Sequence, residues 1–206
     1  MTIKQEIETV LSQIVKKTPY SFFENQIQTK FTNIFFKEMI NIFESDFLRY
    51  YPGCAPEIDL ILLNIPLTGI LLYRISRNFH IHKNDKQALF YSNLTRLFSL
   101  MEIYYTAEIG NGLKINHGFG LVIGANCKVG NNALLYQNTT IGDINPLKKE
   151  REQRPIIDDN IVMYSGAKVL GPVKIGDNVI ISQNAVCTKS IESNQILMAD
   201  GTVKKR

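Results

Sequence analysis

The spacing of apolar residues divides the chain into two halves with different periods. Up to about residue 100, apolar side chains recur at intervals of three and four residues, as on one face of an α-helix. They are Ile7, Val10, Leu11, Ile14 and Val15 in a first segment and Phe31, Ile34, Phe35, Met39, Ile42 and Phe43 in a second. The pattern therefore predicts an α-helical domain over residues 1–100.

Turn and cap residues set the limits of these predicted helices. Thr2 is a candidate N-cap, and Pro19 ends the first helix because proline lacks the main-chain N–H that a helix interior needs. A Tyr-Pro-Gly run at 51–53 interrupts the pattern, and we expect helices again over 58–78 and 85–100.

The most apolar stretch, residues 58–73, is predicted to be a buried helix and not a membrane span. It has about 16 residues, fewer than the roughly 20 that cross a bilayer, and it contains Asp59, Asn64 and Pro66. The N-terminal residues also lack the apolar region of a signal peptide.

After residue 100 the apolar positions recur every sixth residue. They form three registers, separated by a slip of two residues and by one longer break: Ile103, Ile109, Ile115 and Leu121; Ile123, Val129, Leu135 and Ile141; and Ile157, Met163, Val169, Ile175, Ile181 and Cys187. Neither a helix nor a simple strand has this period. It is typical of a triangular coil, in which each hexad supplies one short strand and one turn and the periodic side chain points inward.

Glycine and asparagine occupy the expected corners of this coil. Glycine directly follows a periodic residue at 110, 124, 130, 142 and 176, and asparagines stand at 111, 126, 131, 132, 160 and 178. Both residues tolerate the positive φ of a tight corner. A β-sandwich is the alternative, but its turns come every 8–12 residues. We therefore predict a hexapeptide-repeat parallel β-helix over residues 101–206, with a short C-terminal tail.

Composition excludes several classes of protein. Of 206 residues, 45% are hydrophobic and 20% charged, which argues against a disordered chain or a coiled coil. A net charge of +4 is too small to suggest a nucleic-acid partner. Three cysteines without CxxC spacing and three histidines indicate neither a disulfide framework nor a metal site. We expect a cytoplasmic protein that needs no metal.

The two interruptions of the repeat are the candidate functional segments, because function often lies where a scaffold is broken. The first is the slip at 116–120, Asn-His-Gly-Phe-Gly, and the second is the polar excursion at 142–156, which we expect to project as a loop. A lone histidine is often structural, but His117 lies in the slip, and an imidazole can take a proton from a hydroxyl near neutral pH. His80 and His82 are interpreted as surface residues.

The sequence around these interruptions resembles the serine acetyltransferases of the hexapeptide acyltransferase superfamily. The similar runs are GILLYRISRNF, AEIGNGLKINHGFGLVIGANCKVGNNALLYQNTTIGD and RPIIDDNIVMYSGAKVLGPVKIGDNVII. The resemblance covers about residues 50–197 and includes a helical N-terminal domain that most hexapeptide enzymes lack. It implies an α+β protein, in which the helical domain precedes a left-handed parallel β-helix.

The resemblance also implies direct acetyl transfer from acetyl-CoA to a hydroxyl, without an acyl-enzyme. His117 matches the catalytic base of the family, and Glu102 stands where the family has a carboxylate that orients the imidazole. A solvated coil edge is the alternative role for Glu102. Main-chain N–H groups would hold the oxyanion.

In the family, coenzyme A lies along a groove between neighbouring β-helices of a trimer, and helical domains pair trimers into a hexamer. The positions here that match the coenzyme site are Gly142, Ser165, Gly166 and Gln183. The excursion also contains four cationic residues, Lys148, Lys149, Arg151 and Arg154. They either bind the phosphates of the coenzyme or form, with Glu150 and Glu152, only a solvated surface of the loop. At least a homotrimer is implied.

At the acceptor pocket this chain departs from the family pattern. Asn116 replaces the aspartate before the base, Gln153-Arg154-Pro155 replaces Arg-His-Pro, and Tyr51 replaces the aspartate of Asp-Pro-Ala. Burying the ammonium group of serine without a carboxylate partner would cost several kcal/mol of binding free energy. Amide and phenol side chains instead form hydrogen bonds with neutral hydroxyl groups. We therefore expect Asn116, Gln153, Arg154 and Tyr51 to bind a carbohydrate hydroxyl, as in a surface polysaccharide or its precursor.

Three alternatives stay open from the sequence. The first is a serine O-acetyltransferase of cysteine biosynthesis with a rebuilt pocket, and the second is an N-acetyltransferase of amino sugars, which needs the same base. The third is a non-catalytic β-helix scaffold, against which the presence of His117 and Glu102 argues.

Overall fold

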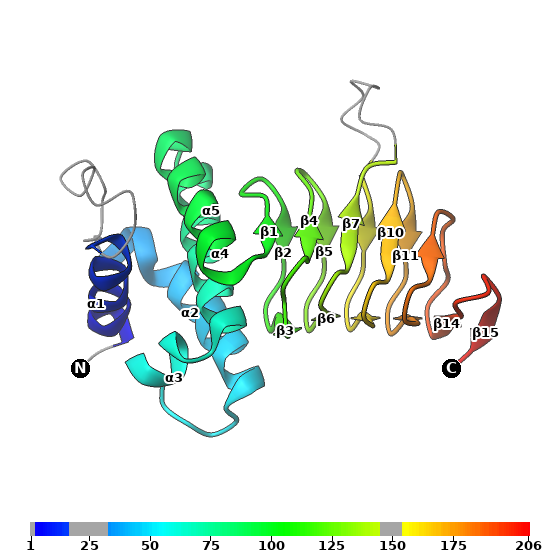
Figure 1. Ribbon diagram of the computed structural model, residues 1–206, viewed down its shortest axis with the longest axis horizontal. Coiled ribbons are helices and arrows are strands. Elements are labelled where there is room, and N and C mark those ends of the chain that lie inside the picture. Colours follow the sequence, from blue (N-terminus) through cyan, green and yellow to red (C-terminus); the bar gives the residue numbers. More distant parts are fainter. Residues whose placement is uncertain (1–2, 17–32, 145–153) are drawn as a thin grey trace.

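The computed structural model describes residues 3–16, 33–144 and 154–206 (Figure 1). Helices make up the first half of this part of the chain: α1 (Ile3–Lys16), α2 (Asn33–Tyr50), α3 (Ile58–Leu62), α4 (Ile65–Ile81) and α5 (Asp85–Ser99). Figure 1 shows them gathered at one end of an elongated stack of strands. The predicted cap and stop at Thr2 and Pro19 lie outside the described residues.

The prediction of one helix over 58–78 was wrong, because α3 and α4 are separate. The Asn64 side chain caps α4 by accepting a hydrogen bond from the Leu67 N–H at 3.2 Å, and Pro66 stands in the first turn. A proline there costs no hydrogen bond, since the first N–H groups of a helix have no partner within it. Among the described residues, no helix combines the length and the hydrophobicity that crossing a lipid bilayer would require.

The second half consists of short strands, one on each side of a three-sided coil. They are β1 (Glu102–Ile103), β2 (Glu108–Ile109), β3 (Lys114–Asn116), β4 (Val122–Ile123), β5 (Lys128–Val129), β6 (Leu134–Tyr136), β7 (Thr140–Gly142), β8 (Ile156–Ile157), β9 (Val162–Met163), β10 (Lys168–Leu170), β11 (Lys174–Ile175), β12 (Ile180–Ile181), β13 (Val186–Cys187), β14 (Gln195–Leu197) and β15 (Val203–Lys205). The first sheet is β1-β4-β7-β10-β13, the second β2-β5-β8-β11, and the third β3-β6-β9-β12-β14-β15. Neighbouring strands are parallel, except that β15 turns back antiparallel on β14. The predicted parallel β-helix is thereby confirmed.

The residues of the six-residue repeat fill the axis of this coil. All fourteen are buried. Ile103 pairs with Ile123 across the two-residue slip, and Val129 pairs with Ile157 across the long excursion. The inner ladder therefore stays in register on both sides of each interruption.

The corners use asparagine and glycine for two different reasons. Positive φ angles occur at Asn126, Asn132, Asn160 and Asn178 as predicted, but not at Asn111 and Asn131, for which the prediction was wrong. They occur also at Asn138, Asn184 and Asn194. The glycines that directly follow periodic residues do not have positive φ, so that interpretation was wrong for them. A Cβ on Gly110 would lie 2.8 Å from the Asn131 nitrogen, and one on Gly176 would lie 2.6 Å from the Ser193 nitrogen. These two glycines are needed because the next coil approaches closely.

Helix α4 covers the open edge of the first coil with polar side chains. The Tyr73 hydroxyl donates to the Ala107 carbonyl at 2.8 Å. Arg74 donates to the carbonyls of Ile109 at 2.6 Å and Gly110 at 2.7 Å. An exposed strand edge is a template for further pairing, and these bonds close it.

Helix α2 completes the same edge and holds β3. Asp46, fully buried, accepts hydrogen bonds from Arg74 Nε at 2.8 Å and from the Leu113 N–H at 2.7 Å. The Tyr50 hydroxyl accepts from the Ile115 N–H and donates to the Ile115 carbonyl, both at 2.7 Å. Burial raises the pKa of Tyr50, so this hydroxyl keeps its proton. The helices thus position the strand that leads to His117.

Candidate active site

His117 occupies the apex of a tight turn directly after β3. Its φ is 65°, and the Gly118 N–H donates to the Asn116 carbonyl at 2.8 Å across it. A three-residue turn with positive φ at its centre is rare and strained in a residue other than glycine. The slip that we predicted to be functional therefore presents an exposed imidazole.

Gly118 is the residue that permits this turn. Its φ is 82°, and a Cβ there would lie 2.7 Å from the sulfur of the buried Met101. No other residue combines this backbone conformation with the absence of a side chain.

A cavity of about 500 Å³ opens beside His117, between the helices and the first coils. Its lining residues are Tyr51, Leu63, Asn64, Ile65, Pro66, Phe98, Ser99, Leu100, His117 and Phe119. Of these, only Tyr51 and His117 were predicted as site residues. The Tyr51 hydroxyl donates to the Leu60 carbonyl and accepts from Asn64 Nδ2, both at 3.3 Å. Phenol and amide groups thus stand near the imidazole within an otherwise largely apolar wall.

A larger cavity of about 670 Å³ lies against the second sheet instead. It is lined by β2, β5 and β8 together with α2 and α4, and it contains none of the predicted site residues. The larger of these two cavities is therefore not the one that His117 lines.

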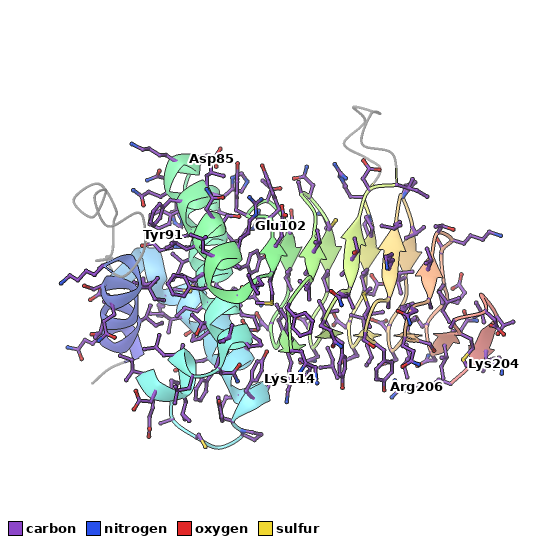
Figure 2. All side chains as sticks on the ribbon, viewed as in Figure 1. Asp85, Tyr91, Glu102, Lys114, Lys204 and Arg206 are labelled. Atoms are coloured by element: carbon purple, nitrogen blue, oxygen red, sulfur yellow. The ribbon has the colours of Figure 1, made fainter. Side chains whose placement is uncertain are left out.

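Glu102 is engaged by an arginine and not by His117. It lies on β1 beside α5 (Figure 2), and its Oε1 accepts from Arg96 Nη2 at 2.7 Å. Among the described residues, no hydrogen bond joins Glu102 to His117. The His117 ring faces Tyr136 instead, with ring centroids 6.4 Å apart. The orienting role of Glu102 stays a prediction.

The predicted acceptor residues fall at two different edges of the coil. Asn116 ends β3, next to His117, and is half-buried. Arg154 lies between the first and second sheets, where its Nη1 pairs with Asp143 Oδ2 at 3.1 Å. Gln153 and the cations at 148, 149 and 151 lie outside the described residues. Within one chain, Tyr51 and Asn116 are thus near His117, whereas Arg154 is not.

Most of the predicted coenzyme residues share one edge with His117, between the third and first sheets. The edge residues, which we call the His117 edge, are His117, Gln137, Ser165 and Gln183, with Gly166 directly after Ser165. The main chain joins successive coils there: Gly166 donates to the Gln137 carbonyl at 3.0 Å, and Asn184 to the Ser165 carbonyl at 2.9 Å. Gly142 lies at the other edge, beside Asp143.

Relatives of known name identify the family. No family model matches the chain. A serine acetyltransferase of Staphylococcus aureus (strain Mu50 / ATCC 700699) is 36% identical over 153 residues, which cover 74% of this chain and 68% of that protein. This chain belongs to the serine acetyltransferase family. A serine acetyltransferase of Staphylococcus epidermidis (strain ATCC 12228 / FDA PCI 1200) is 33% identical over 152 residues, covering 74% and 68% of the two chains.

Solved serine acetyltransferases have the same fold. The Neisseria gonorrhoeae enzyme in complex with serine matches with a TM-score of 0.78 and 21% identity, over 100% of this chain and 84% of that one. The Brucella abortus enzyme in complex with coenzyme A matches with a TM-score of 0.75 and 20% identity, over 100% and 81%. The fold is thus the predicted one, α-helices followed by a left-handed parallel β-helix.

As a member of the serine acetyltransferase family, the protein is an acyltransferase that uses acetyl-CoA as co-substrate. The alternative of a non-catalytic scaffold is therefore not retained. The relatives give no support to the carbohydrate acceptor that we predicted, and they favour the alternative acceptor, serine.

Two of the three cysteines, Cys127 and Cys187, are buried. Burial raises the pKa of Cys127 to about 11, and its thiol donates to the Ile141 carbonyl at 3.5 Å. Burial also raises the pKa of Cys187. Thiols with raised pKa are poor nucleophiles at neutral pH. Over the described residues, no group of three His, Cys, Asp or Glu side chains could hold a metal ion.

Proposed function

We propose that the protein is a serine O-acetyltransferase, which moves the acetyl group of acetyl-CoA to the hydroxyl of L-serine. The observation that carries this proposal is the 36% identity with an enzyme of that name. The exposed imidazole beside a cavity with polar and apolar walls supports it, because a general base needs access to the acceptor hydroxyl.

In the proposed reaction His117 acts as general base. A neutral ring nitrogen takes the proton of the serine hydroxyl while the oxygen bonds to the thioester carbonyl carbon. The carbon–sulfur bond then breaks, and the imidazolium returns the proton to the leaving thiolate of coenzyme A. Main-chain N–H groups near the turn would stabilise the oxyanion.

The acceptor would contact Tyr51 and Asn116, with Asn64 behind Tyr51. The oxygen atoms of these side chains can accept hydrogen bonds from the ammonium group of serine, although they do not neutralise its charge. Their N–H and O–H groups can donate hydrogen bonds to the carboxylate of serine. Glu102 would orient His117 only after releasing Arg96, with which it forms the 2.7 Å contact.

We also infer that the enzyme acts as a homotrimer. Arg154 lies at a different edge from His117, so it would reach an acceptor at His117 only from a neighbouring β-helix. Coenzyme A would then lie between two chains, against Ser165, Gly166 and Gln183. We further propose that two trimers pair through their helices. We also propose a cytoplasmic location, which would keep the three cysteines as free thiols.

Thiol release from acetyl-CoA tests the acceptor. Purified protein is supplied with L-serine or, separately, with sugars, amino sugars, nucleotide-sugars and oligosaccharides. We expect turnover with L-serine. Turnover with a sugar hydroxyl and none with serine would overturn the proposal in favour of a carbohydrate acceptor, and turnover with amino sugars alone would indicate N-acetylation.

Asn116→Asp is expected to lower the KM for L-serine about tenfold, because a carboxylate pairs with the ammonium group more strongly than an amide does. Steady-state kinetics with serine measures the change. Asn111→Asp adds the same charge at an exposed corner on another edge and should leave KM unchanged. An unchanged KM in Asn116→Asp would mean that the ammonium group does not lie near this residue.

A further inference from the structure

The His117 edge contains a buried hydrogen-bond acceptor that has no partner in the described part of the chain. Gln137 directly follows β6, one coil beyond His117, since Asn116 pairs with Tyr136 in the third sheet. Its side-chain Oε1 is buried and, among the residues that the structure describes, accepts no hydrogen bond. The sequence alone did not single out this residue.

The main chain around Gln137 is held in place on both sides. Its carbonyl accepts from the Gly166 N–H at 3.0 Å, and the N–H of Asn138 donates to the Phe119 carbonyl at 3.0 Å. The residue is thus fixed between the His117 turn and the next coil, while its side-chain Oε1 has no partner among the described residues.

An unpaired buried amide oxygen is unfavourable, and folded proteins keep few of them. One reason for keeping such a group is that a ligand supplies its partner. Because Oε1 accepts no hydrogen bond from the described residues, turning it toward a ligand breaks none among them. The three side-chain torsions of glutamine allow that movement.

The place of Gln137 on the edge indicates which ligand group it meets. This step rests on the proposed acetyl transfer at His117, which puts the thioester beside the imidazole. Successive coils are about 4.8 Å apart. In acetyl-CoA two methylene groups separate the sulfur from the first amide N–H of the pantetheine arm, so that N–H comes level with the next coil.

We propose that Gln137 Oε1 accepts a hydrogen bond from the first amide N–H of the pantetheine arm of acetyl-CoA. Each group then satisfies the other, since an amide N–H that leaves water needs an acceptor. The arm would continue past Ser165 and Gly166 along the same edge. Gln137 is therefore a coenzyme-binding residue that also sets the distance of the thioester from His117.

The substitution Gln137→Met tests this pairing, because methionine has a similar length and no comparable acceptor. Titration calorimetry with coenzyme A, without any acceptor, should give a Kd about tenfold higher than that of the wild type. Thermal unfolding should show a Tm about 2 °C higher, since the unpaired oxygen is gone. Gln87→Met, the same change on α5 away from the edge, should leave the Kd unchanged.

A coenzyme analogue supplies a test that needs no variant. Replacing the first amide N–H of the arm by an ester oxygen should weaken binding to the wild type about tenfold and to Gln137→Met hardly at all. Equal losses in both proteins would overturn the proposal, as would an unchanged Kd or a lower Tm in Gln137→Met. Failure of the proposed function would look different: coenzyme A would bind normally and serine would not be acetylated.

Discussion

His117→Asn is expected to lower turnover with L-serine by about 10²–10⁴ while leaving the stability of the protein unchanged. The loss is that of a general base, because the asparagine amide cannot take a proton at neutral pH. The free energy of unfolding should stay the same because asparagine tolerates positive φ better than most residues. Seven corner asparagines of this chain have a positive φ. Thiol release and thermal unfolding measure the two effects.

Two further variants make this result specific. His117→Ala should lose the same activity with little change in stability, because histidine already bears the strain that alanine has at a φ of 65°. His82→Asn changes a histidine at the end of α4, outside the cavity, and should retain full turnover. Turnover of His117→Asn within tenfold of the wild type would show that another group takes the proton.

Asp46→Ala is expected to cost about 3–5 kcal/mol of unfolding free energy, which lowers Tm by about 10 °C. The substitution leaves the Arg74 guanidinium, only 3% exposed, without its counter-charge, and it also removes the acceptor of the Leu113 N–H. Denaturant and thermal unfolding followed by circular dichroism measure the loss. Because Asp46 and Tyr50 hold β3, turnover at His117 should fall as well.

The control for Asp46 is an ion pair at the surface. Glu108→Ala removes a carboxylate that is 50% exposed and lies 3.2 Å from Lys128, and it should cost less than about 1 kcal/mol. The double variant Asp46→Leu with Arg74→Met should recover part of the loss, because neither charge is then left buried alone. A cost below 1 kcal/mol for Asp46→Ala would mean that water reaches Arg74.

The β-helix could be predicted residue by residue because its contacts repeat at short, regular intervals of sequence. Each hexad places its own aliphatic residue on the axis, so the inner ladder from Ile103 to Cys187 follows from the period alone. The same regularity made the slip at His117 visible as an interruption. The glycines at the corners were misinterpreted because glycine is required both where two coils approach closely and where φ is positive. The sequence does not distinguish these two reasons.

The coil, its interruptions, the candidate base and the resemblance to a family could all be predicted from the sequence, because they depend on local spacing and residue type. The surroundings of the base, in contrast, depend on how the helices pack on the coil. Tyr51 and Asn64 come to His117 because α2 and α4 dock on the first coil through buried polar contacts between residues far apart in sequence. The pairing of Glu102 with Arg96 and the unpaired oxygen of Gln137 are likewise properties of positions in space, since whether a polar atom finds a partner depends on three-dimensional distance and not on the residue type.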